Sequence, residues 1–206
     1  MCRLPDYLIP LNVKIGDVLD ALTFQEFFST PLLTEDGQQA LLPEAARAPF
    51  AQLDEVVAKG AVTQQIWRSE FIFGQATLGL LGAMVAAEIN RLFSPVEPYL
   101  FETPLIFNEL SLQRYPAEYG GISPHVDGPK FQNLIALLVL GGHGELYWCK
   151  NRDGEDAVPI PCPAGNLVLL PARGYMERTN TPFHFLTEVT CERYVLGLRQ
   201  NTLLPQ

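Results

Sequence analysis

The chain has 206 residues, of which 48% are hydrophobic, enough for one well-buried core. Its 14 Lys and Arg against 23 Asp and Glu leave a net charge of −9, which disfavours general binding to nucleic-acid phosphates. The first residues lack the continuous apolar segment of a secretory signal. The four cysteines form no CxxC pair. We therefore expect a cytoplasmic protein with free thiols at Cys2, Cys149, Cys162 and Cys191.

The first hundred residues are expected to be mainly helical. Apolar residues recur at helical spacing from Val13 to Phe28, and a turn is predicted at residues 34–37. Pro43 suits the first turn of a second helix that runs toward Gly60. Thr63 is the predicted N-cap of a long helix that ends near Leu92. The apolar run 71–87 within it is short for a membrane span, so a buried helix and no membrane segment are predicted.

From about residue 105 the composition changes to short apolar runs between Gly and Pro residues. Six strands are predicted, at Leu110–Tyr115, Leu134–Leu140, Glu145–Cys149, Leu167–Leu170, Thr187–Cys191 and Tyr194–Leu198. The glycine-rich segment 141–144 is predicted as a hairpin loop, with His143 in solvent. Many short strands at this spacing indicate a sandwich or barrel. The expected fold is α+β: a helical region, residues 1–104, packs on a β-rich core, residues 105–206, in one compact unit.

The pattern richest in chemical information is His125-Val126-Asp127, with His184 57 residues later. Strand side chains alternate, so His125 and Asp127 would project from the same face of one strand. A second imidazole from a later strand would then complete a set of two His and one carboxylate. That set, with its other coordination positions open, is the one used for non-heme Fe(II) that activates O2.

A fixed cation is expected to accompany that centre. Arg193 follows His184 by nine residues and opens a predicted strand. A guanidinium group keeps its charge and offers two parallel hydrogen bonds to a carboxylate. Arg193 therefore suits a dicarboxylate co-substrate.

The stretch from Leu112 to Arg199 resembles the double-stranded β-helix core, a jelly-roll or cupin-like fold, of the Fe(II)/2-oxoglutarate-dependent dioxygenase superfamily. The resemblance rests on the order of its motifs and covers a little under half of the chain. The matching pieces are Gln113-Arg114-Tyr115-Pro116, His125-x-Asp127, the hairpin sequence GGHGELYW, the run 163–170, His184 and Arg193-Tyr194.

The resemblance implies a role for each of these side chains. His125, Asp127 and His184 would hold Fe(II), and Arg193 would pair with the distal carboxylate of 2-oxoglutarate. Tyr115 would place its hydroxyl on the same co-substrate, or it is an ordinary half-buried strand aromatic. Arg199 lies six residues after Arg193, on the same strand face. It would face the co-substrate, as in AlkB-like demethylases, or form a structural salt bridge.

The leading functional hypothesis is hydroxylation of a small-molecule metabolite or biosynthetic intermediate, with consumption of O2 and release of succinate and CO2. The alternatives are an AlkB-like demethylase, a protein hydroxylase and a non-catalytic cupin-like binding protein. A nucleic-acid partner is disfavoured by the charge. The role of the helical half is left open between buttressing the barrel, covering the site and forming a homodimer interface.

Overall fold

The computed structural model describes residues 4–96, 100–118 and 120–205, and Cys2 lies outside them. The helical elements are η1 (Leu4–Tyr7), α1 (Ile15–Asp20), η2 (Ala21–Gln25), α2 (Glu35–Ala46), η3 (Ala58–Gly60) and α3 (Ala76–Phe93). The strands are β1 (Phe28–Pro31), β2 (Ala51–Gln52), β3 (Val56–Val57), β4 (Val62–Gln65), β5 (Trp67–Phe71), β6 (Glu109–Tyr115), β7 (Gly121–His125), β8 (Phe131–Cys149), β9 (Val158–Ile160), β10 (Asn166–Pro171) and β11 (Phe183–Asn201).

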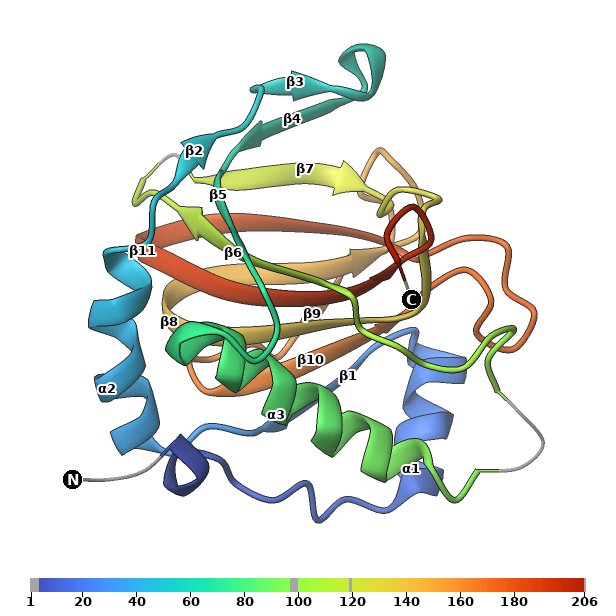
Figure 1. Ribbon diagram of the computed structural model, residues 1–206. Coiled ribbons are helices and arrows are strands. Elements are labelled where there is room, and N and C mark those ends of the chain that lie inside the picture. The colour runs from blue at the N-terminus through green and yellow to red at the C-terminus, as the bar shows by residue number, and fades with distance from the viewer. Residues whose placement is uncertain (1–3, 97–99, 119, 206) are drawn as a thin grey trace.

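Two long strands, β8 and β11, form the centre of the fold and pair with each other along most of their lengths. The first part of β8 also pairs with β10, and its last part pairs with β9. Strand β11 likewise pairs with β7 through its first part and with β6 through its last part. The two strands therefore run from one layer of antiparallel strands into a second layer that faces it (Figure 1).

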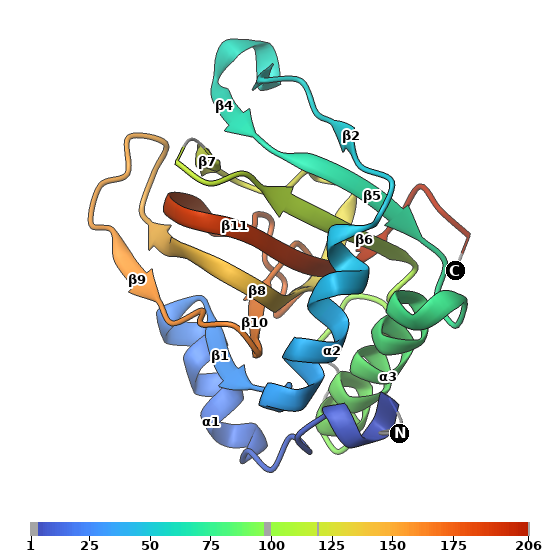
Figure 2. The same ribbon diagram turned by 90° about the vertical axis from the view of Figure 1, so that its left-hand side faces the viewer.

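The outer strands complete the two layers. One layer has the order β1-β10-β8-β11-β6-β5-β2, and β4 extends the other layer by pairing with β7. The β3–β4 hairpin projects beyond β7 at the top of Figures 1 and 2. All of these pairs are antiparallel. Two facing layers of antiparallel strands are typical of jelly-roll folds.

Side-chain alternation along the central strands divides the interior into two clusters. On β8, Leu134, Ala136, Leu138 and Leu140 face the helices, whereas Ile135, Leu137 and Val139 face the space between the layers. The same parity holds on β10, where residues 167 and 169 face the helices and residues 168 and 170 face inward. Since strand side chains alternate strictly, the register of β8 and β11 decides which side chains reach the space between the layers.

The helices cover the outer face of the layer that contains β10, β8, β11 and β6. Helix α3 buries residues that include Leu81, Val85 and Ile89 in the same cluster as β8 and β11. By length and composition alone α3 is apolar enough to cross a membrane, as the core helix of a folded domain also can be. Helix α2 contacts both β8 and β11 (Figure 2).

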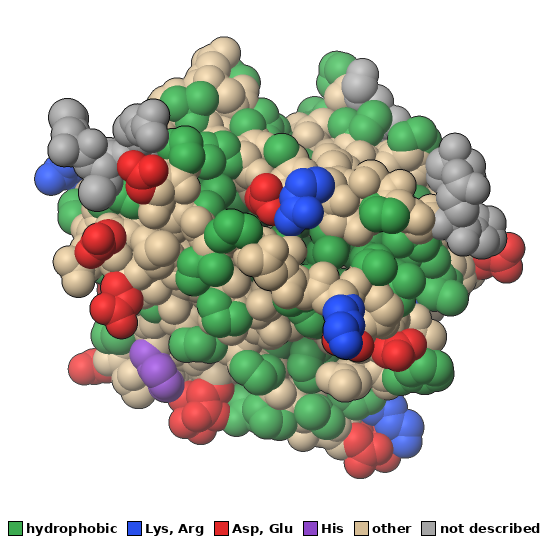
Figure 3. Space-filling model, turned by 90° about the horizontal axis from the view of Figure 1, so that it is seen from below, with side chains coloured by type: hydrophobic (Ala, Val, Ile, Leu, Met, Phe, Trp, Pro, Cys, Tyr) green, Lys and Arg blue, Asp and Glu red, His purple; other side chains and the backbone are tan. Residues whose placement is uncertain are grey.

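On the face seen from below, described Lys and Arg side chains stand singly among acidic and hydrophobic ones (Figure 3).

The predicted strand content is largely confirmed. The strands expected at residues 110–115 and 167–170 are β6 and β10. Cys149, Cys162 and Cys191 are free, as expected. The boundary at residue 104 between a helical region and a β-rich core stays a prediction.

The prediction of a hairpin at residues 141–144 is wrong, because the two strands expected on either side of it are the single strand β8. The strands expected at residues 187–191 and 194–198 are likewise one strand, β11. The register between β8 and β11 shifts near this segment, between Thr187 and Cys191 and again before Val195. The glycines allow close approaches at this corner: Gly141 lies against Leu42 of α2, and Gly142 has a φ of +85°.

Three predictions about the first hundred residues are also wrong in detail. The predicted turn at residues 34–37 is the start of α2, because the Thr34 hydroxyl accepts a hydrogen bond from the Gly37 amide as an N-cap. Pro43 lies inside α2 instead of opening a helix. The helix expected from Val13 ends at Gln25, since Glu26 adopts a left-handed conformation and β1 begins at residue 28.

The long helix expected from Thr63 begins only at Ala76. Residues 62–65 and 67–71 form β4 and β5 instead. Ile66 and the aromatic residues Trp67 and Phe71 recur at a spacing that also fits a helix, but here β5 pairs with β6 over five residue pairs. The backbone hydrogen bonds of that pairing outweigh local helical periodicity.

The close approach at Gly142 gives a test of the strand corner. A Cβ atom at this position would lie 2.1 Å from the Glu192 carbonyl oxygen and 2.5 Å from the Arg193 Cα, at a positive φ. We expect Gly142→Ala to lower the free energy of unfolding by about 2 kcal/mol or more, measured by urea denaturation. Gly16→Ala is the matched control, because a Cβ there would meet nothing within 4 Å. Equal stability of the two variants would contradict the corner geometry.

Candidate functional site

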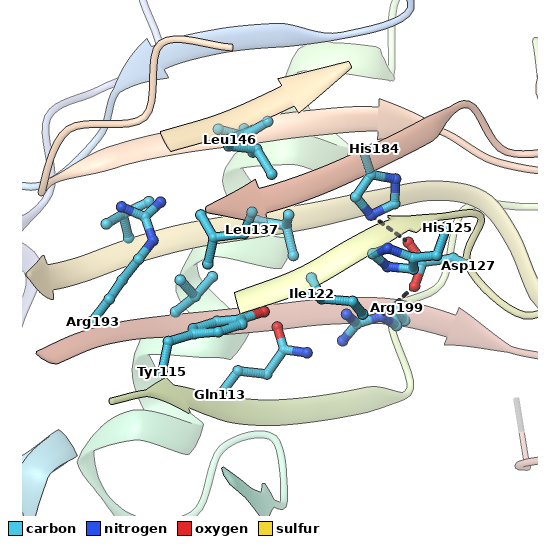
Figure 4. Close-up of a pocket in the computed structure, with 14 residues that line it drawn as sticks. Gln113, Tyr115, Ile122, His125, Asp127, Leu137, Leu146, His184, Arg193 and Arg199 are labelled. Atoms are coloured by element: carbon cyan, nitrogen blue, oxygen red, sulfur yellow. Dashed lines mark ion pairs between the residues drawn. The ribbon is translucent and has the colours of Figure 1, made fainter. Parts of the chain in front are cut away.

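A cavity lies between the two layers, and five strands contribute its walls. Its lining alternates along each strand, as the inward parity of β8 and β11 requires. The side chains that line it are Gln113, Tyr115, Ile122, His125, Asp127, Leu137, Val139, Leu146, Val168, His184, Leu186, Arg193, Val195 and Arg199. Figure 4 shows His125, His184, Asp127 and Arg199 gathered at one end, and Arg193 at the other.

The two histidines come together because their strands are neighbours. His125, the last residue of β7, is the register partner of His184 on β11. Their ring centroids are 4.3 Å apart. Asp127 Oδ2 lies 3.5 Å from His184 Nε2 (Figure 4). Asp127 itself lies two residues beyond the end of β7, so the prediction that it shares a strand with His125 is wrong, although both side chains reach one cavity.

Backbone carbonyl groups orient both imidazole rings in the same way. His125 Nδ1 lies 3.0 Å from the Ser123 oxygen, and His184 Nδ1 lies 3.1 Å from the Pro182 oxygen. A carbonyl oxygen only accepts hydrogen bonds, so each Nδ1 carries the proton. A neutral ring with its proton on Nδ1 presents the lone pair of Nε2, which is the state that binds a metal ion.

The electrostatic environment favours the protonation states of a metal site. Burial lowers the pKa of His125 to about 3, and the neighbouring His184 adds to the effect. Burial alone would raise the pKa of Asp127, but Arg199 and the two imidazoles outweigh it and hold that pKa below its usual value. The site therefore holds a neutral imidazole at His125 and an ionised carboxylate at Asp127.

The ligand geometry is not formed in this conformation. In the described part of the chain, no group of three or more His, Cys, Asp and Glu side chains is arranged to hold a metal ion as it stands. Asp127 is drawn toward Arg199, whose Nε lies 3.7 Å from Oδ1. The donor types fit an ion of intermediate hardness, since two neutral imidazoles and a carboxylate suit Fe(II).

Arg193 lies at the opposite end of the cavity and is 2% exposed. Its Nη1 donates to the backbone oxygens of Gly144 and Cys162, at 3.4 and 3.3 Å. Its Nε is buried with no hydrogen-bond partner. A buried donor without a partner is costly, and an anionic group in the cavity would satisfy it.

Tyr115 lies between the two ends of the cavity (Figure 4). It is the register partner of Arg193 on the neighbouring strand β6, and directly opposed residues share a face. Burial raises the pKa of Tyr115 to about 12, although Arg193 and Arg199 act in the opposite direction. The phenol therefore stays protonated and can donate a hydrogen bond to a molecule in the cavity.

Arg199 also faces the cavity, as its spacing from Arg193 predicts, and it lies beside Asp127. Its Nη1 donates to the Ser111 hydroxyl at 3.3 Å. Its guanidinium carbon lies 5.2 Å from the centroid of the Phe131 ring. Whether it contacts the co-substrate stays a prediction.

Gln113 in the cavity lining, and a cluster around Glu109 outside that lining, were not anticipated from the sequence. Gln113 precedes Tyr115 by two residues, so strict alternation along β6 could have placed it on the same face. Glu109 accepts from Arg68 and from Asn201, both at 2.6 Å, and lies 3.6 Å from Lys130 Nζ. No sequence signal indicates this cluster, because its members come from four separate segments.

His143 is exposed and lies away from the cavity, within hydrogen-bond distance of the Thr190 hydroxyl. The chain has three histidines in total. The three-histidine site of many cupins is therefore not assembled here.

No model of a known protein family matches the chain, and no curated protein matches it either. Solved structures do match along most of its length. A prolyl-4-hydroxylase from Pseudomonas putida is 17% identical, with 91% of this chain and 99% of that chain covered and a TM-score of 0.67. An oxidoreductase of the 2OG-Fe(II) oxygenase family from Burkholderia pseudomallei is 13% identical, with 91% of each chain covered and a TM-score of 0.65.

The chain has the fold of the 2OG-Fe(II) oxygenases. A third match, SnoN, is a non-heme alpha-ketoglutarate-dependent epimerase from nogalamycin biosynthesis; it is 15% identical, with 90% of this chain and 82% of that chain covered and a TM-score of 0.62. Its reaction differs from that of a prolyl hydroxylase, so the 2OG-Fe(II) oxygenase fold does not select a substrate class. The α+β class and the double-stranded β-helix core expected from the sequence are confirmed.

The tautomer of His125 in the 2OG-Fe(II) oxygenase fold can be tested without metal. Because burial lowers its pKa to about 3, we expect a neutral ring with the proton on Nδ1 at pH 6. Long-range 15N–1H correlation spectra of the metal-free protein report this state directly, and His125→Gln identifies the signals. A doubly protonated His125 ring at pH 6 would show that the cavity is more hydrated than its lining indicates.

Proposed function

We propose that the chain is an Fe(II)- and 2-oxoglutarate-dependent oxygenase that hydroxylates a small-molecule metabolite or biosynthetic intermediate. The observation that carries this proposal is the meeting of His125, Asp127 and His184 at one end of a cavity whose other end holds the buried Arg193. The 2OG-Fe(II) oxygenase fold supports it. O2 is the further co-substrate, and succinate and CO2 are the expected co-products.

In this proposal the metal ligands are His125 and His184 through Nε2 and Asp127 through its carboxylate. The carbonyl oxygens of Ser123 and Pro182 keep both rings in the required tautomer. When bound, Fe(II) and 2-oxoglutarate supply the activation of O2 and the oxidising power for a C–H bond. Arg193 offers its unpaired Nε and its charge to the distal carboxylate of 2-oxoglutarate.

The remaining side chains orient the co-substrate and exclude water. Tyr115 donates a hydrogen bond from a phenol that remains neutral. Leu137, Val139, Leu146 and Val195 provide an apolar wall between the two polar ends of the cavity. An apolar, water-poor wall strengthens each ion pair within the cavity and limits side reactions.

Hydroxylation of a protein is the second candidate function. An open groove between β4, β7 and β11 is lined by apolar side chains, by the acidic Glu55 and by uncharged polar side chains that include Gln64 and Thr187. Ile122 and Leu186 line both this groove and the cavity, so a polymer bound in the groove would lie next to the cavity. Succinate release with proline-containing peptides, compared with a metabolite panel, separates the two candidates.

His184→Ala tests the metal site. We expect it to weaken Fe(II) binding by about 100-fold or more and to abolish turnover, because one of three ligands is lost. Anaerobic titration of the metal-free protein with Fe(II) and then 2-oxoglutarate measures this through a weak visible charge-transfer band that needs both additions. His143→Ala is the matched control, since His143 is exposed outside the cavity. Full activity of His184→Ala would refute the assignment.

Arg193→Gln tests the co-substrate end of the cavity. Loss of a charged hydrogen-bond contact is expected to weaken 2-oxoglutarate binding about 100-fold, or by about 3 kcal/mol, with Fe(II) binding unchanged. Isothermal titration of both ligands measures the difference. Arg114→Gln is the control: Arg114 lies on β6 but pairs with the half-exposed Glu192 outside the cavity. Unchanged affinity of Arg193→Gln for 2-oxoglutarate would show that the distal carboxylate binds elsewhere.

A further inference from the structure

The cavity contains a second buried arginine that the proposed binding of iron and 2-oxoglutarate does not use. Arg199 is 6% exposed and lies at the end occupied by the two histidines, whereas Arg193 lies at the opposite end (Figure 4). A buried charge without a fixed counter-charge is costly, so its partners determine its role.

Two neutral groups position Arg199 in addition to its ion pair with Asp127. The Ser111 hydroxyl accepts a hydrogen bond from Nη1 at 3.3 Å, and the Phe131 ring lies 5.2 Å from the guanidinium carbon. Gly197 makes room for the side chain, because a Cβ there would lie 2.5 Å from Arg199 Nη1. The guanidinium group is therefore positioned before any anion reaches it.

One edge of this guanidinium group is left without hydrogen bonds. Arg199 Nε is buried and has no hydrogen-bond partner, and Nη2 has none among the described residues. The N–H groups of Nε and Nη2 point in parallel from the same edge of an arginine, which matches the two oxygens of a carboxylate. Asp127 Oδ1 lies 3.7 Å from Nε, an ion-pair distance that is too long for a hydrogen bond.

The other carboxylate close to Arg199 in the sheet, that of Glu109, already interacts with other side chains. Glu109 is the register partner of Arg199 on β6, but Arg68, Asn201 and Lys130 surround its two oxygens at 2.6, 2.6 and 3.6 Å. Asp127 is the carboxylate assigned to the metal in the proposed function. A metal ion on Asp127 would compete with Arg199 for the charge of that carboxylate, so Arg199 would lack a full counter-charge.

We propose that Arg199 binds a carboxylate group of the substrate through its Nε and Nη2 edge, so that the enzyme acts on a small organic acid. This inference rests on the proposed oxygenase function. The distal carboxylate of 2-oxoglutarate is assigned to Arg193 at the far end, which leaves Arg199 for the substrate. Because Arg199 lies beside Asp127, the C–H bond that is oxidised lies within a few bonds of that acid group.

The test compares acids with their neutral amides on a complex that cannot turn over. The full chain is loaded with Zn(II), which has no redox chemistry, and with 2-oxoglutarate. Binding of propionate, benzoate and phenylacetate, and of propionamide, benzamide and phenylacetamide, is measured by saturation-transfer NMR. We expect at least one acid to bind 10-fold or more tightly than its amide. Arg199→Gln is expected to reduce that preference below about 3-fold, with 2-oxoglutarate affinity unchanged.

Two further variants keep the result interpretable. Arg199→Lys retains the charge but loses the two-point edge, so it should keep part of the acid preference and serves if Arg199→Gln fails to fold. Arg114→Gln makes the same change outside the cavity and should keep the whole preference.

Three results would overturn the proposal: acids and amides that bind equally, no acid that binds, or an acid preference that survives in Arg199→Gln. Loss of 2-oxoglutarate binding in Arg199→Gln would instead assign Arg199 to the co-substrate. Failure of the wild-type chain to bind Zn(II) and 2-oxoglutarate would refute the oxygenase function itself, and this is seen before any acid is added.

Discussion

The pairing of β8 with β11 is the constraint on which the site depends. Each strand passes through both layers, so this pairing, with its register shifts, aligns both the core behind the helices and the cavity between the layers. Alternation sends Arg193, Val195 and Arg199 inward and Tyr194, Leu196 and Leu198 toward the helices. A slip of one residue would exchange the two sets and bury the arginines among the leucines of the helix-facing core. Burial on both faces thus protects the register that positions the chemistry.

The two ends of the cavity carry different sets of ionisable side chains. The two imidazoles and an ionised carboxylate occupy one end, and a buried arginine flanks each end. Both arginines retain a buried Nε without a hydrogen-bond partner. Such donors reduce the stability of the ligand-free chain, and carboxylates entering the cavity would remove that penalty. The same groups therefore weaken the fold slightly and select anionic ligands.

The local sequence predicted two of the strands closely. Strands β6 and β10 were predicted closely because their apolar runs end at Pro, Gly or Asn. Prediction failed where two periods fit equally well: Ile66, Trp67 and Phe71 suit a helix, yet pairing of β5 with β6 decides the outcome. The glycines at residues 141–144 were taken for a hairpin, but they mark a corner within one strand, where Leu42 and Glu192 approach the backbone.

The sequence by itself determined which residue types are available for the chemistry and in what order, because both are read directly from the chain. These residues are His125, Asp127, His184, Arg193 and Arg199. The sequence also determined that Arg193 and Arg199 share a strand face, since an even separation preserves the side of a strand. Only the tertiary structure decided that Asp127 lies beyond its strand beside Arg199, and that Glu109 is surrounded by Arg68, Asn201 and Lys130. Those contacts join segments far apart in the chain, so they depend on strand register and bending, which no local pattern specifies.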